Sequence, residues 1–181
     1  MRKSRIIASA ICALMMLLSN SINAQKFPDL DKSPLDAAWF PNDYKDANKT
    51  VRVLYSRPQL KGRSLSELAP NGKVWRTGAN EAAEINFYTD MYLGKTKIKA
   101  GVYTLYTIPG EKEWTVIINK DKNVWGAYTY NAKNDVARLN IPVTIADDYI
   151  DAFAMVFTKT DKEIVLNLGW DKMRVAIPFT K

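Results

Sequence analysis

The densest group of polar side chains that could do chemistry lies between residues 55 and 84. Its candidate ligand-binding members are Arg57, Arg63, Arg76, Thr77, Asn80 and Glu81. An arginine guanidinium binds carboxylates, phosphates and sulfates through two parallel hydrogen bonds. Gly78 permits a tight loop or a close approach of a ligand to the main chain. The pattern predicts that the arginines converge on a small polar or anionic ligand, which Asn80 and Glu81 orient.

The same residues also admit structural and enzymatic interpretations, and the sequence leaves all of them open. Arg76 could pair with Glu81, and Arg63 with Glu84, to tie a long loop to the body of the protein. Alternatively, Glu81 could act with Arg76 or Lys73 in a hydrolase or lyase. Glu81 and Glu84 could also supply the two carboxylates that a glycosidase requires. No residue is assigned as catalytic, and an enzyme is the less favoured interpretation.

Aromatic residues give a second signal. Trp125 and Tyr128 lie near Gly126 in a stretch that has no strand pattern, so they join the candidate ligand-binding residues. Exposed, they would form a platform for sugar rings; buried, they would fill the core. Trp114 and Trp170 fall within strand patterns and are predicted to be core residues.

The composition excludes several kinds of site. The chain has no histidine, and its single cysteine, Cys12, lies in the apolar run near the N-terminus. Catalysis by Ser-His-Asp or Cys-His groups is therefore excluded, as are histidine proton shuttles. Zinc sites built on histidine or cysteine are excluded as well. The sequence predicts no cofactor and no metal site.

The first 24 residues have the order of a signal peptide. Three basic residues precede the apolar run of residues 6–18, and Ala24 ends a short polar stretch. The run is shorter than the roughly 20 residues that span a membrane. We expect an exported protein, periplasmic or secreted, with no transmembrane segment after cleavage. Without Arg2, Lys3 and Arg5, 23 basic side chains stand against 19 acidic ones, and this net charge of +4 is spread along the chain. A nucleic-acid partner is therefore not expected.

Runs with a period of two dominate the rest of the chain and predict strands. They cover residues 50–55, 84–89, 101–108, 114–119, 136–143, 153–157, 164–168 and 173–179. The last three are expected to form an antiparallel meander, and residues 64–69 a single helical turn begun by a capping box. The fold class is all-β, an antiparallel sandwich or jelly-roll of about nine or ten strands with little helix. Residues 25–48 are expected to be an extended N-terminal segment and residues 49–181 a single β-sandwich domain.

Several motifs resemble a bacterial family known as domain of unknown function 2911 (DUF2911), common in Bacteroidetes. They are Tyr55-Ser56-Arg57-Pro58, Gly72-Lys73-Val74-Trp75-Arg76-Thr77-Gly78-Ala79-Asn80-Glu81-Ala82, Ala100-Gly101-Val102-Tyr103-Thr104-Leu105 and Trp125-Gly126-Ala127-Tyr128. The resemblance implies an exported, β-rich protein and no particular activity. The favoured function is a non-catalytic binding module for a small polar or anionic ligand, a glycan or an envelope partner. A structural envelope component without a small-molecule site is the other non-enzymatic alternative.

Overall fold

The computed structural model describes residues 25–181, and the predicted signal peptide over residues 1–24 lies outside this range. Asp31–Lys181 form one compact unit, and residues 25–30 contain no helix or strand. The elements are β1 (Leu35–Phe40), β2 (Val51–Ser56), α2 (Leu65–Leu68), β3 (Glu84–Phe87), β4 (Met91–Leu93), β5 (Thr96–Ile98), β6 (Gly101–Ile108), β7 (Glu113–Asn119), the 3-10 turn η1 (Ala132–Asn134), β8 (Asp135–Lys159) and β9 (Ile164–Thr180). None of the helices within residues 25–181 has the length and apolar character needed to cross a bilayer.

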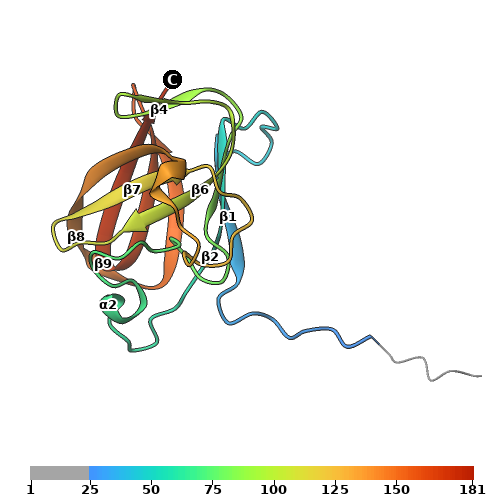
Figure 1. The fold of residues 1–181 in the computed structure, drawn as a ribbon, viewed down its shortest axis with the longest axis vertical. Coiled ribbons are helices and arrows are strands. Elements are labelled where there is room, and N and C mark those ends of the chain that lie inside the picture. The colour runs from blue at the N-terminus through green and yellow to red at the C-terminus, as the bar shows by residue number, and fades with distance from the viewer. Residues whose placement is uncertain (1–24) are drawn as a thin grey trace, which may run out of the picture. The chain divides into compact units, whose positions relative to one another are not determined.

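Among the described residues, nine strands form one antiparallel sheet in the order β1-β2-β3-β6-β7-β8-β9-β4-β5. The long strand β8 pairs with β7 through residues 135–142 and with β9 through residues 143–159. The sheet turns over along β8, and its two halves share one core, with β6 and β7 in front of β9 in Figure 1. The predicted all-β, antiparallel fold class is confirmed.

The core between the two halves is built around aromatic rings. Trp75 stacks on Trp170 of β9 with 5.4 Å between ring centroids, and it meets Trp114 of β7 edge-on at 5.8 Å. Phe153 of β8 packs edge-on against both Trp75 and Trp170. Trp114 and Trp170 are fully buried, which confirms their predicted place in the core. Large aromatic side chains bury more apolar area than any others, so this cluster holds the halves together without a disulfide.

The strand predictions from alternation are largely confirmed, but the C-terminal part is longer and simpler than expected. The predicted meander is wrong, because residues 164–168 and 173–179 belong to the single strand β9. Likewise, the predicted runs 136–143 and 153–157 are both parts of β8. Asp171 takes a positive φ of 54° within β9, and the pairing of β8 with β9 shifts register near this point. The polar Asp171-Lys172 pair therefore marks an irregularity inside a strand and not the turn that its composition suggests.

The predicted helical turn is also confirmed. Ser64 precedes α2, and its main-chain N–H donates to Glu67 Oε2 at 2.6 Å. The Ser64 hydroxyl donates to the same oxygen at 2.7 Å. These hydrogen bonds from Ser64 hold the pKa of Glu67 below its ordinary value. They satisfy hydrogen-bonding groups at the start of α2, a helix too short to be stable alone.

Candidate functional site

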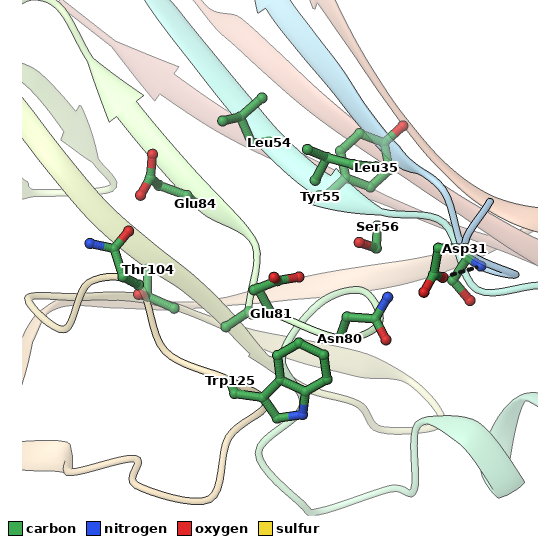
Figure 2. Close-up of a pocket in the computed structure, with 13 residues that line it drawn as sticks. Asp31, Leu35, Leu54, Tyr55, Ser56, Asn80, Glu81, Glu84, Thr104 and Trp125 are labelled. Atoms are coloured by element: carbon green, nitrogen blue, oxygen red, sulfur yellow. Dashed lines mark hydrogen bonds between the residues drawn. The ribbon is translucent and has the colours of Figure 1, made fainter. Parts of the chain in front are cut away.

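A cavity of about 810 Å³ opens on the outer face of the β2-β3-β6 part of the sheet. Figure 2 shows Asn80 and Glu81 between the indole of Trp125 and strand β2 in this view. The lining residues are Asp31, Ser33, Leu35, Leu54, Tyr55, Ser56, Asn80, Glu81, Ala82, Glu84, Thr104, Asn123 and Trp125. Its size is that of a small-molecule site.

The floor of the cavity is a row of side chains across neighbouring strands. Leu54 of β2 lies opposite Glu84 of β3, which in turn lies opposite Thr104 of β6. Directly opposed residues of an antiparallel sheet point to the same face, so these three share the outer face. The row continues to Asn119 of β7 and Asp135 of β8. Its first three members line the cavity, and the last two bind the loop that forms the cavity wall.

That loop, residues 120–134, folds back over the sheet and is fixed to the segment 80–82. Glu81 and Trp125 form an isolated antiparallel bridge. The Ala82 N–H donates to the Val124 carbonyl at 3.0 Å, and the Gly126 N–H donates to the Asn80 carbonyl at 3.0 Å. Main-chain pairing therefore holds the loop against the segment that supplies Asn80 and Glu81.

Trp125 and Tyr128 are the exposed aromatic residues of this loop. Trp125 is 60% exposed and lines the cavity, whereas Tyr128 is 81% exposed and lies outside the lining. Gly126, between them, has a φ of +68°, and a Cβ there would lie 2.6 Å from the Tyr128 ring. The Tyr128 ring thus lies over the main chain of Gly126, and a side chain at this position would have to displace the ring.

A polar network beneath the loop holds both of its ends, at Asp121 and at residues 130–131. The buried Asn119 donates through Nδ2 to Asp135 Oδ1 at 2.8 Å and to the Asn131 carbonyl at 3.2 Å. Its Oδ1 accepts from the Asp121 N–H at 2.8 Å. Asp135 Oδ2 also accepts from the Tyr130 hydroxyl at 2.8 Å. Burial, and next the hydrogen bond to Asp135, raise the pKa of Tyr130.

Tyr106 of β6 lies on the same outer face of the sheet, but its hydroxyl takes no part in this network. Its ring meets that of Tyr130 edge-on at 5.2 Å, and the side chain is completely buried. Its hydroxyl has no hydrogen-bond partner among the described residues. Burial, followed by the negative charge of Asp121, raises the pKa of Tyr106 to about 12.

The three candidate arginines make contacts within the protein and do not line the cavity. Arg57 donates to Asp36 Oδ2 at 3.1 Å and to the Phe153 carbonyl at 2.9 Å. Arg63 donates to the carbonyls of its own loop, Leu60 and Gln59, at 3.0 and 2.7 Å. Arg76 has one long contact, 3.4 Å from Nε to the Gly78 carbonyl. The ion pairs among residues 25–181 include neither Arg76 with Glu81 nor Arg63 with Glu84.

The segment that carries Thr77 and Asn80 is packed closely against β2. Thr77 is buried, and its hydroxyl lies 3.1 Å from that of Thr107 on β6. Thr77 and Asn80 have positive φ values of 53° and 58°. A Cβ at Gly78 would lie 3.0 Å from the Ser56 carbonyl oxygen. Thr77 therefore supports the segment from below, while Asn80 and Glu81 project beside the cavity.

Negative charge predominates in the cavity. Asp31, Glu81 and Glu84 line it, and no lysine or arginine of the described chain does. The side chains of Glu81 and Glu84 have no ion-pair or hydrogen-bond partner within residues 25–181, although Glu84 is half-buried. The described residues also contain no group of three or more acidic, histidine or cysteine side chains placed to hold a metal ion.

Sequence reasoning missed Leu54 and Thr104 in the floor of the cavity, and it considered Glu84 only as a partner of Arg63 or of Glu81. Leu54, Glu84 and Thr104 are far apart in the chain and become neighbours only through strand register. Each occupies an outward position of an alternating run, a signal that identifies the face but not its neighbours across the sheet. Asn123 and Ser33 lie in irregular segments, where no periodicity applies.

Comparison with known proteins gives one match. Residues 41–179 match the model of the family described as "Protein of unknown function (DUF2911)". No curated protein and no solved structure matches the chain. The family match spans all the strands from β2 to the greater part of β9, and thus every wall of the cavity except the residues before β2.

Proposed function

Because the chain belongs to the DUF2911 family, whose description assigns no activity, we propose a function from the geometry of its cavity: a non-catalytic binding module for a hydroxyl-bearing ligand such as a glycan. Asn80, Glu81 and Trp125 are the ligand-binding residues of the sequence prediction that this proposal retains. Export, inferred from the order of residues 1–24, belongs to the same proposal.

The observation that supports the proposal is an exposed indole on a main chain whose two neighbouring residues are hydrogen-bonded to the segment 80–82. Trp125 is 60% exposed within the cavity, yet its neighbours Val124 and Gly126 both pair with the segment 80–82. An exposed aromatic ring on a fixed main chain provides apolar contact at little entropic cost, because only its two side-chain torsions remain to be ordered by the ligand. The apolar C–H face of a sugar ring suits such a surface.

The polar groups around Trp125 suit the hydroxyls of the same ligand. Glu81 and Glu84 accept hydrogen bonds, while Asn80 and Asn123 both donate and accept. An apolar surface with a few convergent polar groups is the usual composition of a small-molecule site.

Binding is favoured over the hydrolase or lyase that pairs Glu81 with Arg76 or Lys73, because neither basic residue lines the cavity. Glu81 and Glu84, the carboxylates of the glycosidase hypothesis, both line it, so recovery of the ligand intact decides between binding and hydrolysis.

The proposal is tested by a thermal-shift screen of the purified protein with neutral, amino and acidic oligosaccharides. We expect at least one to raise the Tm and to be recovered intact after incubation. Trp125→Ala should weaken its binding roughly 30-fold, the equivalent of about 2 kcal/mol of lost apolar contact. Trp39→Ala is the matched control, because Trp39 lies on β1 and does not line the cavity.

Two results would contradict the proposal. One is the absence of a Tm shift with every oligosaccharide tested. The other is a Tm shift that survives unchanged in Trp125→Ala, which would place the ligand elsewhere on the protein.

A further inference from the structure

The charge of the cavity points to the charge of its ligand. Asp31, Glu81 and Glu84 contribute three carboxylates, and no basic side chain of the described chain lines the cavity to neutralise them. A carboxylate is an acceptor only, so these groups require donors from the ligand. An anionic ligand would be repelled, and a neutral sugar would satisfy them only through its hydroxyls.

Within residues 25–181, the carboxylates of Glu81 and Glu84 form no ion pair and accept no hydrogen bond. Four other acidic side chains of the described chain, Asp36, Asp90, Asp135 and Asp148, are paired with an arginine or a lysine. Glu84 is half-buried on the floor of the cavity, and its carboxylate has no partner among the described residues. A cation in the cavity would supply the partner that the described chain does not.

The aromatic wall favours a cation as well. The face of a tryptophan ring attracts an ammonium group electrostatically, and more strongly when nearby groups exclude water. Trp125 and Glu81 are paired through their main chains, so the ring and one carboxylate are held on the same wall. Figure 2 shows both beside the cavity, with Glu84 further along the floor.

We propose that the cavity beneath Trp125 selects amine-bearing ligands, amino sugars in particular, whose ammonium groups pair with Glu81 beside the indole and with Glu84 further along the floor. This inference rests on the proposed function, because it specifies the ligand of the same site. The ligand charge it assigns is opposite to the anionic one that the arginines suggested in the sequence, because Arg57, Arg63 and Arg76 do not line the cavity.

The test uses four tetrasaccharides with the same β-1,4-linked backbone and different substituents. They are built of glucosamine, glucose, N-acetylglucosamine and glucuronic acid. Titration calorimetry is performed at about pH 6, where an amine of this kind is protonated. We expect the glucosamine tetramer to bind at least roughly fivefold more tightly than the two neutral tetramers, and the glucuronic acid tetramer to bind least. The preference for glucosamine should shrink in about 1 M salt, because salt screens charges near the surface.

Matched variants assign the preference to the cavity. Glu81→Gln and Glu84→Gln should each weaken glucosamine binding roughly three- to fivefold and change glucose binding less than twofold. Glu111→Gln is the control, since Glu111 is exposed and does not line the cavity. It should leave all four affinities unchanged.

The outcomes separate the inference from the proposed function. If the neutral tetramers bind in a Trp125-dependent manner with no preference for glucosamine, the inference is overturned and the binding function stands. The same follows if glucuronic acid binds best, or if Glu81→Gln and Glu84→Gln leave the preference intact. If none of the four tetramers binds, the inference and the proposed function fail together.

Discussion

The main chains of Glu81 and Trp125 pair as an antiparallel bridge, although Glu81 precedes β3 in the chain and Trp125 follows β7. Hydrogen bonds on either side, from Ala82 to Val124 and from Gly126 to Asn80, extend this pairing. The cavity wall is therefore a short two-stranded ribbon with a carboxylate on one strand and an indole on the other. The positions of Glu81 and Trp125 depend on this ribbon.

Gly126→Ala should loosen this ribbon. The variant combines an unfavourable positive φ with a clash against the Tyr128 ring. We expect the free energy of unfolding to fall by roughly 1–3 kcal/mol, and oligosaccharide binding to weaken because the Tyr128 ring must move. Urea unfolding and calorimetry measure the two effects.

Gly62→Ala is the control for Gly126→Ala. Gly62 also has a positive φ, of 81°, but a Cβ there would meet no atom within 4 Å. It should lose only about 1–2 kcal/mol and bind oligosaccharides normally. Equal losses of stability and binding in both variants would show that the contact with Tyr128 does not position the loop.

Asn119→Ala should destabilise the protein through the loop that carries Trp125. The buried amide links Asp135, the Asn131 carbonyl and the Asp121 N–H, and its removal leaves these groups short of partners. We expect a loss of roughly 1–3 kcal/mol in urea unfolding.

Asn140→Ala provides the comparison for Asn119→Ala. Asn140 is exposed on β8, where its side chain bonds Thr115 and Glu113 at the surface. A change below about 0.5 kcal/mol is expected. The account of the loop network would be wrong if the two asparagine variants were equally stable.

Tyr106→Phe and Tyr55→Phe should have opposite effects, although both tyrosines are buried. The Tyr55 hydroxyl accepts from the Met155 N–H at 2.8 Å, so Tyr55→Phe should cost about 1–2 kcal/mol. The Tyr106 hydroxyl has no partner among the described residues, so Tyr106→Phe should be neutral or stabilising by up to roughly 1 kcal/mol. A clear loss of stability in Tyr106→Phe would indicate a hydrogen bond that the structure does not show.

The same tyrosine predicts a pH dependence in the alkaline range. The pKa of Tyr106 is about 12 in the folded protein and about 10 in the unfolded chain. Below about pH 10 both states keep the proton, and above it the unfolded state loses it first. Stability is therefore lost as the pH rises from about 10 to about 12.

Tyr106→Phe isolates this contribution from that of the other titrating groups. Between about pH 9 and about pH 11, the protein with Tyr106 should lose roughly 1 kcal/mol more stability than the phenylalanine variant. Urea unfolding at the two pH values measures the difference. Identical losses would mean that Tyr106 ionises as readily in the folded protein as in the unfolded chain.

Most of the fold could be predicted from the sequence because each long strand carries its own local signal. The alternation in β6 and β7, and the capping box from Ser64 to Glu67, correspond to the observed elements within one or two residues. β1, β4 and β5 were not predicted as strands. Leu35–Phe40 has small and polar residues among its apolar ones, and pairing with β2 supplies what its pattern lacks. β4 and β5 have three residues each, too few to show a period.

The candidate site could be predicted only in part, because pairing across the sheet is not a local property. Asn80, Glu81 and Trp125 were identified by residue type within loops, and all three line the cavity. The arginines next to them in sequence have other partners, since Arg57 meets Asp36 across β1 and β2. Closeness in the chain suggested one cluster, but the three arginines lie in the irregular segment between β2 and β3 and bond to β1, to β8 or to carbonyls of that same segment.

The most direct test of the account is an NMR titration of the protein with the glucosamine tetramer, observing the indole N–H of Trp125, which is assigned from the spectrum of Trp125→Phe. If the cavity binds the ligand, this resonance should shift in a saturable manner, while that of the buried Trp170 stays in place. A Trp125 resonance that does not move at any ligand concentration, or movement confined to Trp39, would contradict a ligand site between Trp125 and the sheet.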